Sequence, residues 1–132
     1  MPNLILLFSH TFTPEQISEA ENKLKINEFI NLPEKLQKMF SEIEPAGELN
    51  LEILRSIADW LGKTAKNGDF VLIQGEFGAT VYLVDFCFHN GLSPIYATSK
   101  RVYEEKINDD GAIERKHIFK HVNFRRYVKG GK

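Results

Sequence analysis

Residues 70–80 read FVLIQGEFGAT, and this stretch decides the fold. Its uninterrupted apolar run, residues 70–73, is typical of a strand that is buried on both faces of a parallel sheet. The glycines that follow predict a tight turn into a helix over residues 79–89. Because that segment is apolar nearly all round, we expect the helix to be deeply covered.

The residues on either side repeat the same alternation of strand and helix. Residues 4–8 form a second continuous apolar run, and Thr13-Pro14-Glu15-Gln16 provides a capping box with proline at the first helical position. A short strand is expected over residues 28–32, helices from Pro33 and from about residue 51, and a fourth strand over residues 94–98. This alternation predicts a Rossmann-like, doubly wound, mostly parallel α/β sheet with strand order 2-1-3-4.

The C-terminal part of the chain follows a different pattern. Residues 102–107 and 112–127 flank the segment Asn108–Gly111, whose Asp-Gly pair is a strong turn signal. We therefore expect an antiparallel two-stranded hairpin appended to the parallel sheet. Residues 130–132 are expected to be a loose end, and residues 1–132 to form a single domain.

Composition excludes several classes of protein. The 132 residues are 42% hydrophobic and carry a net charge of −1, so no global field attracts DNA, long RNA or an anionic membrane. The single cysteine, Cys87, excludes an internal disulfide and fits a reducing compartment. The longest apolar run is too short to cross a bilayer. We expect a cytoplasmic protein.

Three predicted strands end in small or polar residues. In a parallel α/β sheet the carboxyl ends of the strands form one rim, and ligands bind where the chain reverses direction along it. Hydroxyls, an imidazole, glycine N–H groups and two cations would meet there, which suits a phosphate-bearing ligand. The candidates for chemistry are Ser9, His10 and Lys100; the candidates for ligand binding are Gln74, Gly75, Glu76, Phe77, Gly78, Ala79, Thr80, Thr98, Ser99 and Arg101.

The glycine segment matches neither standard phosphate motif. It lacks the third glycine of a dinucleotide fingerprint and the Lys-Ser/Thr of a P-loop. What remains is a helix N-terminus whose backbone N–H groups face a ligand, or a turn that merely needs glycine at positive φ. Glu76 would repel phosphate unless it turns outward or contacts a base or ribose. Lys100 and Arg101 can clamp phosphate or remain a solvated pair at a strand end.

Hydrolase and metal motifs are absent from the sequence. No Asp or Glu lies at a spacing that would orient His10 in a triad, and no G-x-S-x-G elbow occurs. The four histidines show no HExxH pattern, so neither a metal nor a cofactor is expected. The alternating residues 115–125, with His117, His121 and Arg125, form either a solvated face or a basic wall facing a ligand or partner subunit.

With these residues in place, the chain resembles small stand-alone CRISPR-associated proteins of type III systems that have a Rossmann-like fold. The resemblance covers nearly the whole chain. Its matching parts are the opening residues 3–10 with the Thr-Pro-Glu-Gln helix start, residues 68–80, residues 94–101 and residues 117–125. Such proteins are similar to the CRISPR-associated Rossmann-fold (CARF) sensor domains, which bind cyclic oligoadenylate messengers at a symmetric dimer interface.

The resemblance implies a homodimeric ring nuclease that binds and cleaves cyclic tetra-adenylate without a metal. The ribose 2′-OH would attack its own 3′-phosphate, and positioning with charge stabilisation would supply the rate. The alternative is a sponge or sensor that binds the ring without cutting it. A third alternative is a flavodoxin-type nucleotide- or cofactor-dependent enzyme, or a protein-interaction subunit.

Overall fold

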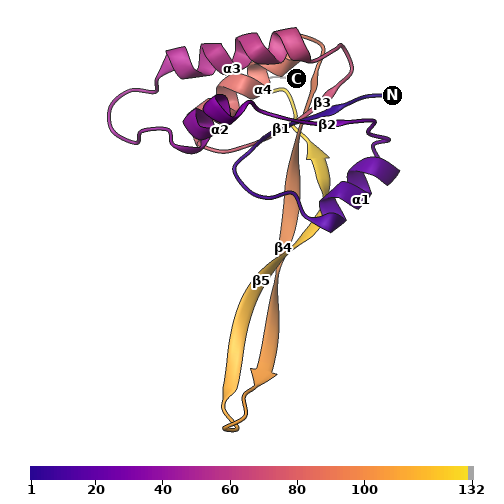
Figure 1. The fold of residues 1–132 in the computed structure, drawn as a ribbon, viewed down its shortest axis with the longest axis vertical. Coiled ribbons are helices and arrows are strands. Elements are labelled where there is room, and N and C mark those ends of the chain that lie inside the picture. Colours follow the sequence, from indigo (N-terminus) through magenta and orange to yellow (C-terminus); the bar gives the residue numbers. More distant parts are fainter. Residues whose placement is uncertain (131–132) are drawn as a thin grey trace.

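A computed structural model describes residues 1–130, which form one five-stranded sheet with helices on both faces (Figure 1). The strand order is β2-β1-β3-β4-β5, and only the β4–β5 pair is antiparallel. This confirms the predicted α/β class and its C-terminal hairpin. The elements are β1 (Leu4–Phe8), α1 (Pro14–Asn22), β2 (Phe29–Asn31), α2 (Glu34–Ser41), α3 (Leu51–Thr64), β3 (Phe70–Gln74), α4 (Phe77–His89), β4 (Ser93–Ile107) and β5 (Ile113–Arg126).

The first strand and helix form for the reasons that the sequence indicates. β1 pairs with β2 on one side and with β3 on the other, so both its edges and both its faces are covered. α1 begins in a complete capping box. The Gln16 amide donates to Thr13 Oγ1 at 3.3 Å, and the Thr13 amide donates to Gln16 Oε1 at 2.9 Å. The turn after β1 is thereby fixed.

The sheet divides the core into two layers. α1 covers one face, where Leu4 and Leu72 pack with Ala20 and Phe124. The helices α2, α3 and α4 cover the other face, over Ile5, Val71 and Ile73 among others. The expectation that α4 is deeply covered is wrong on one side, because Val81 is 69% exposed.

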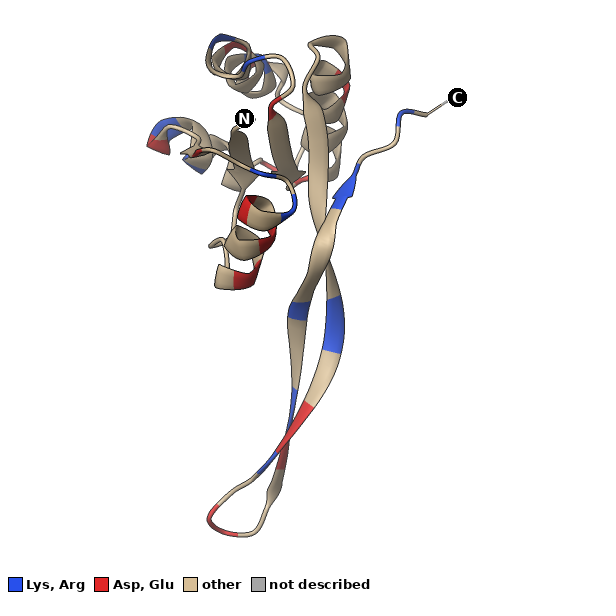
Figure 2. Cartoon of the chain, turned by 90° about the vertical axis from the view of Figure 1, so that its right-hand side faces the viewer, with Lys and Arg blue, Asp and Glu red and all other residues tan. Residues whose placement is uncertain are grey.

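The fourth strand is much longer than expected. β4 does not end at Thr98 but continues to Ile107, and its outer part pairs with β5 to form a ribbon that leaves the body of the molecule (Figures 1 and 2). We call residues 99–121 the arm. A bulge lies at its start: Thr98 pairs with Asn123 but Ser99 pairs with His121, so Val122 has no partner. The run Thr98–Arg101 is therefore the base of an arm and not the end of a strand.

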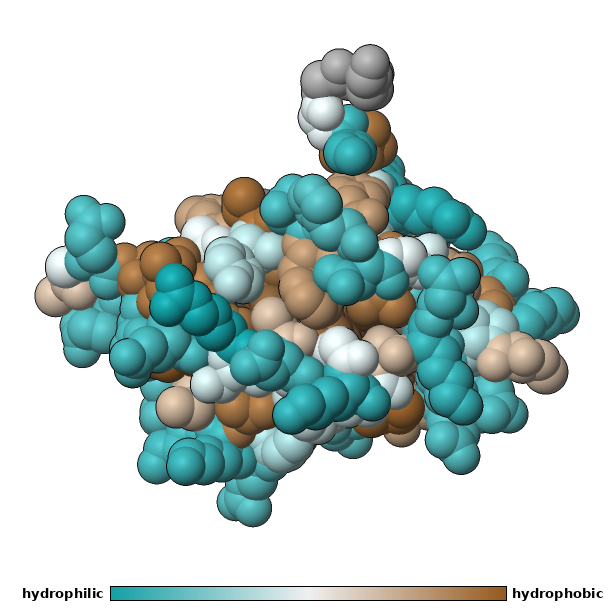
Figure 3. Space-filling view, turned by 90° about the horizontal axis from the view of Figure 1, so that it is seen from above, coloured by the Kyte–Doolittle hydropathy of each residue, from teal (hydrophilic) through white to brown (hydrophobic). Residues whose placement is uncertain are grey.

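The surface at the opposite end of the body from the arm is mixed. Viewed from that end, hydrophilic side chains are interrupted by separate apolar ones (Figure 3). Among residues 1–130, no helix combines the length and the apolar character needed to cross a membrane. The expected loose end over residues 130–132 lies, for residues 131–132, outside the described part of the chain.

Candidate functional site

The carboxyl ends of β1 and β3 meet at one rim, and the arm rises from that rim. β3 pairs in register with β4 as far as Leu72 and Ile95. Gln74 then closes the end of β3, because its side-chain Oε1 accepts the Ala97 amide at 2.8 Å. Thr98 and the residues after it thus continue past the end of β3 by about 3.3 Å per residue. The predicted ligand segments share this edge of the sheet.

The end of β1 is held by α2. The Gln37 side-chain amide donates to the Phe8 carbonyl at 3.1 Å, and the Ser41 hydroxyl lies 3.3 Å from the Ser9 hydroxyl. His10 follows as an exposed side chain whose ring lies edge-on to Phe8, with 5.4 Å between centroids. Within residues 1–130 the His10 ring has no hydrogen-bond partner. The imidazole is therefore accessible and not oriented by a carboxylate.

The glycines of residues 75–78 are required by packing. Neither Gly75 nor Gly78 has a positive φ, so the turn does not need glycine for its backbone conformation. A Cβ at Gly75 would lie 2.6 Å from the buried ring of Phe40, and one at Gly78 would lie 2.9 Å from Leu49. The small residues in this segment let α2 and the loop before α3 close over the start of α4.

Glu76 occupies the helix N-terminus that was expected to face an anion. Its Oε1 accepts the Ala79 amide at 2.8 Å, so the carboxylate caps α4 and offsets the positive end of the helix dipole. The Thr80 amide donates to the Glu76 carbonyl. A carboxylate at this position disfavours phosphate in the glycine segment. The Phe77 ring beside it is 88% exposed and can stack on a planar group.

Lys100 and Arg101 lie on opposite faces of the arm, because neighbouring residues of a strand alternate in direction. Arg101 is paired with Phe119, and its guanidinium lies 5.5 Å from the centre of that ring. Lys100 is directly opposite Lys120. Lys100 and Arg101 therefore do not point to the same side for a single phosphate clamp. Lys100 has Lys120 as its register partner instead, and we call these two residues the cation pair.

The hydroxyl of Thr98 is already engaged. It lies 2.7 Å from Asn123 Oδ1, on the same side of the strand as Lys100. Ser99, on the other side, is exposed next to His121. Of the residues predicted at this strand, Ser99, Lys100 and Arg101 are exposed and have no ion pair or hydrogen bond inside the described residues, and of these three Arg101 lies over the Phe119 ring.

A buried pair at the base of the arm was missed by the sequence analysis. His121 Nε2 lies 2.6 Å from Glu19 Oε1, and the two side chains are only 6% and 11% exposed. The other oxygen of Glu19 accepts the Phe124 amide at 2.9 Å. Both carboxylate oxygens therefore tie α1 to β5. His121 Nδ1 is buried without a partner among residues 1–130.

Comparison with known proteins places the chain in a family. A family model described as "Uncharacterized protein MJ1673 family" matches residues 2–125, which include the whole arm. The chain belongs to the MJ1673 family. It is 46% identical over 127 residues to "Uncharacterized protein MJ1673" of Methanocaldococcus jannaschii, and the match covers 96% of this chain and 98% of that protein. No solved structure matches the chain significantly.

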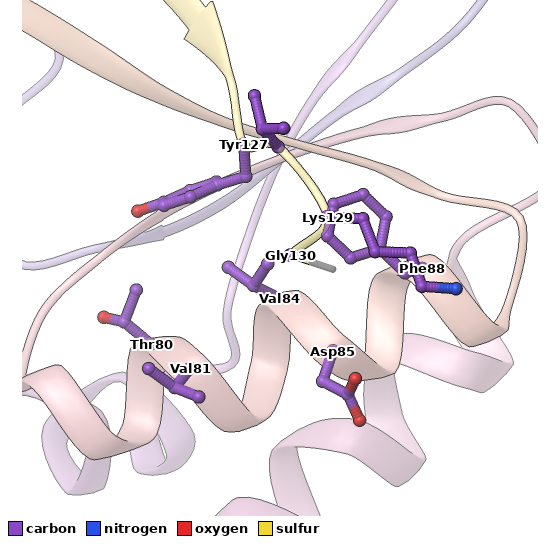
Figure 4. A pocket seen from close by; sticks show the side chains of 9 residues that line it. Thr80, Val81, Val84, Asp85, Phe88, Tyr127, Lys129 and Gly130 are labelled. Carbon is purple, nitrogen blue, oxygen red and sulfur yellow. The ribbon is translucent and has the colours of Figure 1, made fainter. Parts of the chain in front are cut away.

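In this member of the MJ1673 family, a groove of about 310 Å³ runs along α4 beside the C-terminal segment (Figure 4). Thr80 and Phe88 mark its two ends on the helix, and Tyr127 and Lys129 face them. The Tyr127 hydroxyl donates to the Ile73 carbonyl at 2.6 Å, and burial, with a smaller contribution from Tyr96, raises the pKa of Tyr127. The hydroxyl is thus a structural donor, whereas Thr80 Oγ1 is buried without a partner inside residues 1–130.

Metal ligands do not gather in the part of this family member that the structure describes. Within residues 1–130 there is no group of three or more His, Cys, Asp or Glu side chains placed to hold a metal ion. Asp69, a buried acid, lies at the opposite end of the sheet, where its oxygens accept the amides of Asn3 and Lys66 at 3.0 and 2.8 Å. The Asp69 carboxylate thereby fixes the N-terminal ends of β1 and β3. Both of its oxygens accept a backbone amide in doing so.

Proposed function

We propose that the chain binds cyclic tetra-adenylate as a homodimer at the rim and cleaves it without a metal. The observation that carries the proposal is the cation pair Lys100–Lys120. Like charges directly opposite each other destabilise an antiparallel pair. Neither ammonium lies within ion-pair distance of a carboxylate among the described residues. A phosphate between them removes the repulsion and gains charge-assisted hydrogen bonds.

The charge at the foot of the arm supports the same ligand class. Residues 98–102 and 118–126, which we call the base segments, contain five Lys and Arg residues and no Asp or Glu. The net charge of the whole chain is −1, so this positive charge is local. Each subunit presents one such lysine pair to the phosphates of a cyclic tetranucleotide. A twofold ligand also suits an isologous dimer.

The proposed reaction needs no protein nucleophile. The ribose 2′-oxygen attacks the adjacent phosphorus in line, the bond from phosphorus to the 5′-oxygen breaks, and the 5′-oxygen takes up a proton. The products carry a 2′,3′-cyclic phosphate and a 5′-hydroxyl. His10 would assist removal of the 2′-OH proton, Ser9 would help to position the ribose, and Lys100 would stabilise the charged phosphorane.

The binding experiment compares two lysines on the same face of the same strand. Lys100 faces Lys120, whereas Lys106 faces Glu114. Loss of a charge-assisted contact costs about 1.5–3 kcal/mol, so Lys100→Ala should weaken cyclic tetra-adenylate binding roughly 10- to 150-fold. Lys106→Ala should leave the affinity within about twofold, as for an exposed surface pair. An equal loss of cyclic tetra-adenylate affinity in the two variants would show that the Lys100–Lys120 pair does not bind the ligand.

The cleavage experiment separates a nuclease from a sponge. His10→Ala should slow single-turnover cleavage at least tenfold, within the range of about 10²–10⁴ that acid–base help contributes, while binding changes only a few-fold. EDTA should have no effect. One observation favours the alternative function of sequestration: His10 has no orienting partner within residues 1–130. Tight binding with an intact ring after long incubation would establish the sponge.

A further inference from the structure

The two faces of the arm differ in chemistry. Tyr103, Ile107, Ile113 and Phe119 lie on one face, because Ile107 pairs with Ile113 and the others follow at alternate positions of the same pairing. These four side chains are between 61% and 75% exposed. We call them the apolar face of the arm. The other face carries six charged residues among its eight positions between residues 100 and 120. The first face also carries Arg101, Glu105, Arg115 and His117, so its large exposed apolar side chains alternate with polar ones, and its apolar groups are uncovered.

The body of the subunit gives the arm little support. The ribbon leaves the body below α1, and nothing packs on its outer part in either view (Figures 1 and 2). A two-stranded ribbon alone in water is marginally stable at best. The accessible surface of the chain is 9076 Å², whereas a compact monomer of 15.2 kDa exposes about 7,100 Å². The difference of about 2,000 Å² exceeds the roughly 800 Å² that each partner buries in a standard interface.

Charge varies along the arm in a self-complementary way. The outer half, residues 103–117, contains five acidic and three basic residues, and the turn itself carries Asp109 and Asp110. The base segments contain five basic residues and no acid. An antiparallel arrangement of two arms would place the acidic turn of each beside the basic base of the other. The alternation of signs along the outer half is unlike the continuous positive surface that nucleic acids and anionic membranes require.

We propose that two copies of this chain dimerise by packing the apolar faces of their arms together, antiparallel, about a twofold axis at Glu105. This register places Tyr103 of one copy over Ile107 of the other, and Arg101 beside the turn residue Asp109. Glu105 is the β4 residue that meets its own copy, and its ion pair with Arg115 at 3.4 Å offsets the like charge of the two carboxylates there. The apolar face is thereby buried.

This arrangement rests on the homodimer in the proposed function but not on its ligand. Lys100 and Lys120 lie on the charged face of each arm and stay accessible when the apolar faces meet. In this register the lysine pairs of the two copies lie ten strand positions apart, about 33 Å along the ribbon, so each pair meets ligand phosphates separately. The arms then hold the two bodies with their rims toward each other. Binding of cyclic tetra-adenylate and formation of the arm interface are separate measurements, so one can fail while the other stands.

The test uses neighbouring cysteines on the two faces of β4. In the full-length protein, Glu105→Cys places a thiol at the proposed axis, and Glu104→Cys places the same thiol one residue away on the charged face. Each variant is treated with a bifunctional thiol reagent that bridges sheets packed about 10 Å apart. The native Cys87 is buried and serves as a silent background. We expect a covalent dimer from Glu105→Cys that persists on dilution, and several-fold less from Glu104→Cys.

Sedimentation provides the second measurement. Replacing Tyr103 and Ile107 together by lysine should give a monomer, whereas the charged-face exchange Glu104→Lys with Lys106→Glu should remain a dimer. A wild-type protein that sediments as a monomer overturns the proposal. Equal cross-linking of the two cysteine variants, or a dimer that survives the Tyr103 and Ile107 substitutions, overturns the arm interface while leaving dimerisation elsewhere. Unaltered cyclic tetra-adenylate binding by a monomeric arm variant would show that the site is complete in one subunit.

Discussion

Replacing Glu19 by alanine should destabilise the fold more than replacing any other acidic residue of α1. The carboxylate accepts from His121 at 2.6 Å and from the Phe124 amide at 2.9 Å. Truncation leaves two buried partners without an acceptor, each at about 1–3 kcal/mol. Allowing for water entering the vacated space, we expect a loss of about 2–4 kcal/mol. An unfolding entropy of about 2.1 cal/mol/K per residue converts this into a fall in Tm of roughly 7–14 °C.

Thermal and urea unfolding followed by circular dichroism, at one protein concentration, measure this loss. Glu21→Ala is the matched control, because Glu21 lies on the same helix and is exposed without an ion pair among the described residues. Its change should stay within about 0.5 kcal/mol. Glu19→Gln keeps one acceptor and should fall between the two. If Glu19→Ala unfolds at the same temperature as Glu21→Ala, the buried pair does not anchor the arm.

The remaining predictions concern packing at two glycines and the burial of Cys87. Gly75→Ala forces a Cβ to within 2.6 Å of Phe40 and should cost about 1–3 kcal/mol in urea unfolding. Gly62→Ala meets only an ordinary 3.5 Å contact with Phe86 inside α3 and should gain about 0.5–1 kcal/mol; a stabilising Gly75→Ala would contradict the assigned packing. Burial raises the pKa of the Cys87 thiol from 9.0 to about 12, so thiol reagents should modify it only at the rate of unfolding. Because the fold favours the neutral thiol, this contribution to stability is complete below the ordinary pKa and is lost as pH rises from 9.0 toward 12, which alkaline unfolding of Cys87→Ala against wild type checks.

The parallel part of the sheet was predictable because burial on both faces leaves a clear signal. The runs at residues 4–8 and 70–73 are continuously apolar, and β1 and β3 occupy those segments. The start of α1 was predictable because a capping box is a local feature of four residues. In both cases the signal lies within the few residues of the element itself, although the strand that covers β1 on one edge comes more than 60 residues later.

The course of β4 was not predictable by the same reasoning. Its outer half is exposed on both faces, so polar residues such as Ser99 and Lys100 give no sign of whether the strand ends or continues. The long hairpin register that continues it depends on β5, which comes later in the chain. The glycines at 75 and 78 were misleading for a similar reason, since the side chains that require them, Phe40 and Leu49, come from other elements.

The pairing of Glu19 with His121 spans 102 residues, and no spacing rule connects positions so far apart. One local signal was available. Glu19 lies three residues from Gln16 and next to Ala20, both of which are buried, so helical periodicity turns it toward the sheet. A carboxylate on the inward side of an amphipathic helix needs a buried partner. That argument predicts a partner for Glu19 but not its identity.

The placement of β3 between β1 and β4 also governs the order in which the chain can fold. The β4–β5 ribbon joins residues close together in sequence and can form as soon as its turn is made. β1 is synthesised first, yet only the three residues of β2 can pair with it until β3 emerges. The most apolar strand of the chain therefore spends longest without its main partner. During synthesis on the ribosome, we expect this segment to be the one most exposed to aggregation and to chaperone binding.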